Sequence, residues 1–275
     1  MSAAAGHAVR GRAAGGRAAL VVAAATLAWA AAQAVTTFTV RRDDTELVIS
    51  NRALASEGAR SIGNNPNCED GMRLTIVYGP PPGHVETRVE DAVITSHLAL
   101  VRTPAEAKEG GGQETLELTG ATVTFNRPGC IEESTPSDEP AVTLVQGRTT
   151  VVGTRFFLDR EENVGTMDGP ISLTRAPADE GEAPLTASSS SMTFAVDEQR
   201  ATLQGDVRVT SQERTTTGDT LTLDEEAGTA VLTGSPARSV RGSDVLEGAR
   251  LLYYLDSDDV VVIGNVAGEL EVEIE

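Results

Sequence analysis

One short pattern recurs four times in the second half of the chain, and it constrains the fold more than any other feature. Each copy has an apolar residue, an acidic turn, a strand-like run, a glycine, and then apolar residues at every second position. The copies are LDREENVGTMDGPISL (158–173), VDEQRATLQGDVRV (196–209), LDEEAGTAVLTGSPA (223–237) and LDSDDVVVIGNV (255–266). Apolar residues at period two are typical of strands with one buried face, and Asp, Glu, Asn and Gly favour turns. Each copy therefore predicts a β-hairpin with an acidic tip.

The spacing inside the copies keeps matching side chains on one face. The distance from the turn Asp to the glycine is 10, 8, 10 and 8 residues along the chain. Because successive side chains point to opposite faces of a strand, an even difference leaves every following residue on its original face. The glycine is expected at a bulge, a sharp bend or a close approach of two backbones.

A single hairpin of this kind cannot bury its apolar face alone. Hairpins laid side by side bury it in a shared interior, as in repeat arrays, so the pattern predicts an all-β stack. Periodicity leaves two possibilities open. The interior is either filled by the protein's own side chains or partly open as a groove.

The remainder of the chain also indicates short strands, separated by polar insertions. Alternating runs predict strands in TTFTVR, ELVIS, RLTIVY, RVEDAVITS, LALVR, ETLEL, ATVTF, AVTLV and GELEVEIE. Residues 126–140 and 175–191 are rich in Pro, Ser and acidic residues, and we interpret them as loops within a continuous sheet. We expect a divergent N-terminal β region over 35–140 and the repeats over 141–275.

The first 34 residues have the features of a secretory signal peptide. Three arginines precede an apolar run from Ala18 to Ala32, and the run ends at an A-x-A cleavage site. The mature protein is then exported and begins at Val35. The alternative is an uncleaved membrane anchor, although the run is shorter than the roughly 20 residues needed to span a bilayer.

The chain contains two cysteines, Cys68 and Cys130, and both lie among turn-forming residues. In an exported protein such a pair predicts one disulfide. No paired histidines or CxxC motif accompany them, so a zinc site is not expected.

Charge and motif content exclude several functional classes. Without the leader, the chain has 41 acidic and 19 basic side chains (22 minus the three leader arginines). The negative electrostatic potential of such a protein repels nucleic acid. The sequence has no HExxH, G-x-S-x-G, P-loop or GxGxxG motif, so we expect neither an enzyme nor a bound cofactor. A calcium ladder at the acidic tips is conceivable, but turn formation already explains these acids.

Residues 188–266 resemble the OstA-like repeats of periplasmic lipopolysaccharide-transport proteins, most closely the LptA type. The matching elements are Gly205-Asp206-Val207, Gly264-Asn265-Val266 and Gly218-Asp219-Thr220-Leu221. The resemblance covers about 142–275. It implies a twisted β-jellyroll, or β-taco, whose apolar trough carries the acyl chains of a glycolipid.

The resemblance also implies site residues and partners. It assigns the trough lining to the apolar residues of matching parity in the four hairpins: Phe156, Leu158, Phe194, Val196, Leu203, Val207, Leu221, Leu223, Leu232, Tyr253, Leu255, Val262 and Val266. Members of this family stack end to end between an inner-membrane ABC transporter complex and an outer-membrane assembly. Unpaired edge strands would allow such stacking by β-augmentation.

The leading hypothesis is therefore a non-enzymatic, periplasmic lipid-transport protein, held at the inner membrane if its leader is retained. The alternative is an exported structural or adhesive β-array with a closed core. The two hypotheses differ in whether the purified protein carries a lipid.

Overall fold

A computed structural model describes residues 36–42, 45–106, 114–137, 139–177, 183–195, 200–255, 260–264 and 267–269. Residues 34–275 form one compact unit, and its regular elements are strands apart from one 3-10 turn, η1 (Ala55–Glu57). The expected all-β fold with antiparallel hairpins is confirmed. Within the described residues, no helix has the length and hydropathy needed to cross a membrane. The predicted leader lies outside these residues.

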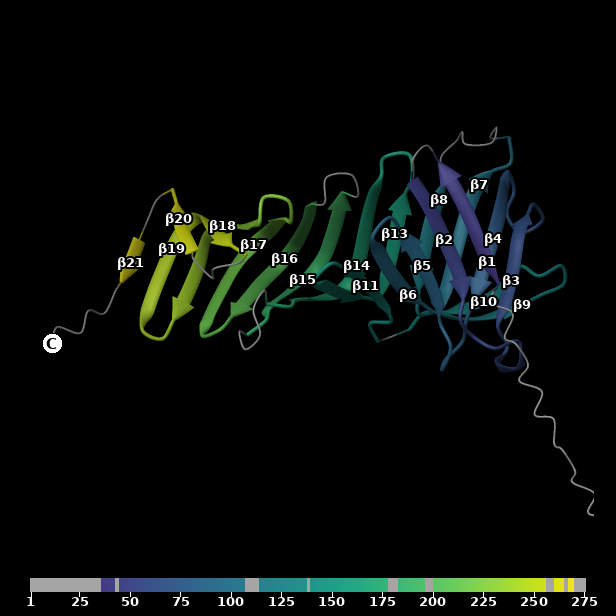
Figure 1. The fold of residues 1–275 in the computed structure, drawn as a ribbon, viewed down its shortest axis with the longest axis horizontal. Coiled ribbons are helices and arrows are strands. Elements are labelled where there is room, and N and C mark those ends of the chain that lie inside the picture. Colours follow the sequence, from purple (N-terminus) through teal and green to yellow (C-terminus); the bar gives the residue numbers. More distant parts are fainter. Residues whose placement is uncertain are drawn as a thin grey trace, which may run out of the picture. The chain divides into compact units, whose positions relative to one another are not determined.

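The strands form two layers, which share long strands in the second half of the chain (Figure 1). The separate strands of the first layer pair in the order β3 (Arg60–Asn65), β4 (Met72–Tyr78), β7 (Leu98–Pro104), β8 (Thr115–Thr119) and β13 (Arg155–Asp159). Those of the second layer pair in the order β1 (Thr37–Arg42), β2 (Thr45–Asn51), β5 (Val85–Val89), β6 (Ala92–Ser96), β11 (Val142–Gln146) and β12 (Thr149–Gly153).

Six longer strands follow, and each contributes to both layers. They lie side by side in chain order: β14 (Val164–Arg175), β15 (Leu185–Ala195), β16 (Arg200–Ser211), β17 (Arg214–Asp224), β18 (Thr229–Arg241) and β19 (Asp244–Tyr254). The first half of β14 pairs with β13, whereas its second half pairs with β12. At the other end β19 pairs with β20 (Val260–Ile263) in the first layer and with β21 (Ala267–Glu269) in the second.

Three sequence expectations about local structure were wrong. The run RVEDAVITS is two strands, β5 and β6, because Glu90 and Asp91 form the turn of a hairpin. The predicted loop 126–140 contains β10 (Ile131–Thr135), which pairs with β9 (Thr122–Phe125). The Ser run of the predicted loop 175–191 belongs to β15, where Ser189 is buried and its neighbours Ser188 and Ser190 are exposed. Of GELEVEIE, only Gly268 and Glu269 lie within the described residues.

One hydrophobic core runs between the two layers. It includes Leu47 of β2, Val101 of β7, Leu144 of β11, Leu203 of β16 and Leu251 of β19, all at most 3% exposed. Strands of both layers contribute alternate residues to this interior, as the period-two pattern predicts. The core therefore extends without a break from the N-terminal strands to the repeats.

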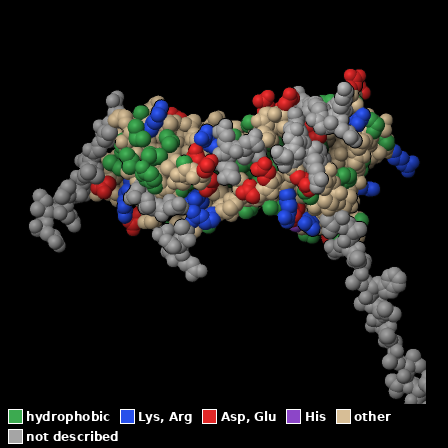
Figure 2. Space-filling view, turned by 45° about the horizontal axis from the view of Figure 1, so that its top comes forward, with side chains coloured by type: hydrophobic (Ala, Val, Ile, Leu, Met, Phe, Trp, Pro, Cys, Tyr) green, Lys and Arg blue, Asp and Glu red, His purple; other side chains and the backbone are tan. Residues whose placement is uncertain are grey.

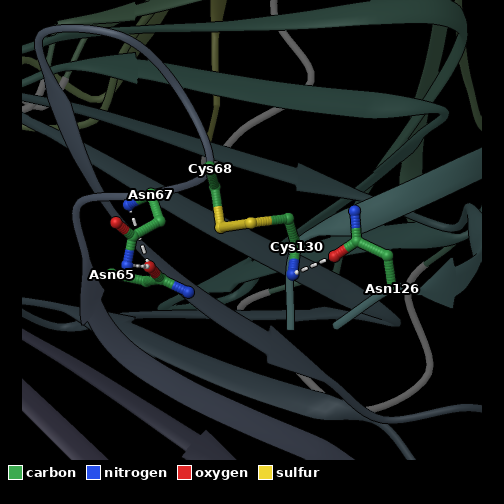
Figure 3. The surroundings of a disulfide bond; sticks show 5 residues. All are labelled: Asn65, Asn67, Cys68, Asn126 and Cys130. Atoms are coloured by element: carbon green, nitrogen blue, oxygen red, sulfur yellow. Dashed lines mark hydrogen bonds between the residues drawn. A yellow bond between two sulfur atoms is a disulfide. The ribbon is translucent and has the colours of Figure 1, made fainter. Parts of the chain in front are cut away.

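A second core covers the outer face of the first layer. Strand β7 carries Leu98, Ala99, Leu100 and Val101, all buried, and alternate members face the two cores. The β9–β10 hairpin supplies further apolar residues, and the Cys68–Cys130 disulfide ties it to the turn between β3 and β4 (Figure 3). The Cα atoms of the two cysteines are 5.2 Å apart, and Asn126 accepts a hydrogen bond from the Cys130 amide.

Candidate functional site

A line of bends crosses the six long strands and separates the two layers. The pairing register shifts once in each neighbouring pair, for example between Asp168 and Ile171 and between Gln204 and Val207. Gly169 in β14 and Gly205 in β16 have φ angles of +97° and +80° at these bends, and Gly264, between β20 and β21, has a φ angle of +109°. Such angles suit glycine, because L-residues with a Cβ are strained there. In β14 and β16 the glycine thus lets one strand serve both layers.

Small residues lie beside the bends because the neighbouring strand approaches closely. A Cβ placed on Gly205 would lie 2.9 Å from Oγ of Ser190, and one on Gly169 would lie 2.2 Å from Oγ1 of Thr154. Ser189 and Ser190 occupy the bend of β15, which explains why a Ser-rich segment is a strand.

The structure brings most of the predicted lining residues together in the interior. Those at most 6% exposed and in the inner core are Phe156, Leu158, Phe194, Leu203, Val207, Leu221, Leu223, Leu232 and Tyr253. Leu255 and Val262 are partly buried and pack against this core. Val196 and Val266 lie outside the described residues.

The side chains of the protein itself fill nearly all of this interior. Between the layers, described residues line one cavity of about 10 Å³ and one of about 30 Å³. Both are lined by Leu144, Gln146 and Phe194, so they adjoin the same aromatic ring. A water molecule in the liquid takes about 30 Å³, so neither cavity holds an acyl chain in this conformation.

Polar contacts close the seam opposite the bends, where the ends of the two layers meet. Glu225, in the β17–β18 turn, accepts hydrogen bonds from Oγ1 of Thr149 at 2.8 Å and from Arg175 at 3.3 Å. Arg175 also donates to the Leu255 carbonyl at 3.2 Å, and its side chain is 6% exposed. These contacts join strands of the second layer to hairpin tips of the first.

Sequence reasoning missed this seam, although one signal was present. Arg175 shares the parity of the inward residues Ile171 and Leu173, and a charge on a buried face needs a partner. Farther along, the hydroxyl of Tyr253 in the first layer donates to Oγ1 of Thr216 in the second. Thr216 in turn bonds Oγ of Ser239 at 3.0 Å.

The acidic tips that the structure describes act as turn formers. Asp159 accepts from the amides of Glu161 and Glu162, and Asp224 accepts from the amide of Ala227. That amide, together with Arg200, lowers the pKa of Asp224 below its usual range. The tip acids Asp256, Asp258 and Asp259 lie outside the described residues. Within those residues, no three His, Cys, Asp or Glu side chains are grouped as metal ligands.

Comparison with known proteins places the repeats in a family. Residues 139–259 match the family described as "LptA/(LptD N-terminal domain) LPS transport protein". No curated protein matches the chain.

A search of solved structures found a crystal structure of LptH from Pseudomonas aeruginosa. It is described as the LptA-homologous periplasmic component of the conserved lipopolysaccharide transport device. Its identity to this chain is 13%, its TM-score is 0.30, and the alignment covers 66% of this chain and 95% of LptH.

The matched residues 139–259 span β11 to β19 and contain all six bent strands. The matched family is one of transport proteins and not of enzymes. The repeat region, residues 139–259, is thus similar to the LptA/LptD N-terminal family of lipopolysaccharide-transport proteins.

Proposed function

We propose that this protein binds the acyl chains of lipopolysaccharide, or of another glycolipid, between its two strand layers. The observation that carries the proposal is the continuous apolar interior of β11 to β19, which coincides with the family match. We infer a periplasmic location after export through residues 1–34. A retained leader would instead hold the protein at the inner membrane.

Access to this interior would be through the seam. The two small cavities lie there, beside Phe194, and the polar contacts of Glu225 are the groups to be separated. Burying each methylene contributes about 0.8 kcal/mol, so one chain of a dozen carbons contributes on the order of 8 to 10 kcal/mol before ordering costs. This gain is large enough to offset the loss of a few hydrogen bonds at about 1 kcal/mol each.

The proposed partners are an inner-membrane ABC transporter complex, an outer-membrane assembly and further copies of this chain. The edge strand β20 supports end-to-end stacking, because in the described part of the chain it pairs with β19 alone. Its Val261 and Ile263 are each 45% exposed, and Figure 2 shows hydrophobic side chains gathered at this end. An exposed apolar edge is a template for adding another strand.

A second candidate is a structural or adhesive β-array with a closed core. The small volume of the interior cavities favours it, because the structure holds no preformed groove of acyl-chain size between the layers of the described strands. The two candidates make opposite predictions about bound lipid.

The test is lipid extraction from protein purified out of the bacterial envelope, followed by mass spectrometry. We expect a stoichiometric amphiphile with the wild type. Ala201→Trp, which fills the larger seam cavity, should remove that amphiphile. Thr202→Trp is the matched control, because Thr202 pairs with Thr222 on the other face of the sheet and should leave lipid binding intact. Lipid-free wild-type protein would support the closed array.

A further inference from the structure

A large cavity in the described part of the chain lies outside the interior, on the outer face of the first layer. Its volume is about 600 Å³, within the range of about 300 to 1,000 Å³ typical of small-molecule sites. The outer side chains of β4, β7, β8 and β13 form its floor, and the β9–β10 hairpin forms its roof. This cavity plays no part in the proposed function above and is independent of it.

Most of the cavity wall is apolar. Leu74, Leu98 and Leu100 rise from the floor, and Ile131 and the Cys68–Cys130 disulfide lie on the roof side. An open apolar space of this size is poorly solvated, so a ligand with an apolar body would gain free energy by displacing its water.

The polar side of the cavity is a row of paired charges. Arg102 donates to Glu69 at 3.2 Å and to Glu117 at 2.8 Å, and Arg155 donates to Glu117 at 2.7 Å and to Asp168 at 3.3 Å. Burial raises the pKa of Glu117, but the two arginines outweigh it and hold that pKa below its usual range. Of the charged groups that line the cavity, the carboxylates of Glu117 and Asp168 balance the guanidinium groups of Arg102 and Arg155, so the row carries no surplus of positive charge.

This charge balance determines which head group fits. Each arginine uses Nε and one terminal nitrogen in these contacts, which leaves its second terminal nitrogen to donate to a ligand oxygen. Hydroxyl groups of Thr119, Ser134 and Ser137 also line the cavity. An anionic head group would find no unbalanced positive charge in the cavity and would meet the net charge of −19 of the whole chain.

We propose that this cavity binds an uncharged amphiphile, with its apolar body over the leucine floor and its hydroxyl or carbonyl oxygens against the Arg102–Arg155 row. The cavity is thus a second binding site, and its head-group preference is opposite to that expected for an anionic glycolipid. The disulfide keeps the roof in place over it.

The experiment is isothermal titration calorimetry of the full chain with 1-monolauroylglycerol, below its micelle concentration, with laurate as the anionic comparison. We expect one saturable site for the monoglyceride, with a Kd at least tenfold lower than for laurate. Ser134→Trp places a ring in the cavity from an exposed strand position and should raise that Kd at least tenfold. Leu100→Trp, from the floor, should do the same.

Thr135→Trp is the matched control, because Thr135 neighbours Ser134 on β10, is also exposed, and does not line the cavity. Its Kd should stay within twofold of the wild type. Undiminished binding by Ser134→Trp would place the monoglyceride in the interior and overturn the assignment. The absence of saturable binding would overturn it as well, and tighter binding of laurate would overturn the head-group assignment.

Discussion

The N-terminal region (36–137) and the C-terminal region (139–269) build the same two layers in different ways. In the C-terminal region six strands of 11–13 residues each bend once and belong to both layers. In the N-terminal region each layer has its own strands of at most seven residues. The six long strands connect the two layers through their own backbone, and the N-terminal region must connect them through side chains.

The side-chain connections of the N-terminal region are visible at its far end. The amide of Asn51, on β2, donates to the carbonyls of Arg60 and Tyr78 at the edge of the first layer. A second core and a disulfide reinforce the outer face of that layer. The comparison teaches that bent strands connect the layers through the backbone and add polar contacts at the seam, whereas the short strands depend on side-chain contacts alone.

The largest expected effect comes from a charge in the shared interior. Leu203→Asp buries a carboxylate at a position that is fully inaccessible in the wild type. We expect a loss of about 4 kcal/mol or more in the free energy of unfolding, measured in urea. Gln204→Asp, one residue along and exposed, should change it by no more than about 0.5 kcal/mol. Equal effects of both variants would contradict the assignment of faces.

Removing the disulfide should affect the N-terminal region selectively. The bridge spans 62 residues, and on the chain-entropy model it contributes about 4 kcal/mol. With Cys68→Ser and Cys130→Ser together, amide hydrogen exchange should speed up in β9 and β10. Exchange in β16 to β18 should remain slow, and equal loss of protection in both regions would refute the distinction between them.

A substitution at a bend should cost more than one at an open turn. Gly205→Ala adds a Cβ at a φ of +80° and 2.9 Å from Ser190, so we expect a loss of about 2–3 kcal/mol. Gly242→Ala has a φ of +58° with open space around it, so its loss should be about 1 kcal/mol. The two unfolding midpoints, compared in urea, isolate the effect of close strand approach. If the two variants are equally stable, close approach at the bends is unimportant.

The smallest effect concerns the charge row of the outer face. Glu117→Gln should lower the free energy of unfolding at pH 7 by about 1 kcal/mol, because its carboxylate is paired with two arginines. The pKa of Glu117 is lower in the folded than in the unfolded protein. Its carboxylate therefore stabilises the folded state fully at pH values above the unfolded pKa of about 4.3. The difference in the free energy of unfolding between Glu117→Gln and the wild type should therefore disappear as the pH falls through the pKa that Glu117 has in the folded protein. A difference that persists at low pH would show that charge is not its origin.

The sequence predicted the repeats well because their information is local. Parity fixes which face of each strand is buried, and the glycines mark the bends at Gly169, Gly205 and Gly264. The turn role of Asp159 and Asp224 is also local, since each bonds amides within three residues.

The rest depends on partners that are distant in sequence. The alternation of apolar residues in β6 and β8 does not reveal their partners. Strand β6 pairs with β11 in the second layer, and β8 pairs with β13 in the first layer. The seam residue Glu225 looks like another tip acid until Thr149 and Arg175 are brought beside it. The second core did leave a signal: Leu98-Ala99-Leu100-Val101 is apolar without alternation, as in a strand buried on both faces.

The central claim is that acyl chains enter between the two layers beside Phe194. The most direct measurement places a photo-crosslinking amino acid at Phe194, on the interior side, and at Thr202, on the outer face of β16. After irradiation in cells, we predict lipid attached at position 194 and none at position 202. Folded protein that captures no lipid at position 194, or captures equal amounts at both positions, would contradict the account.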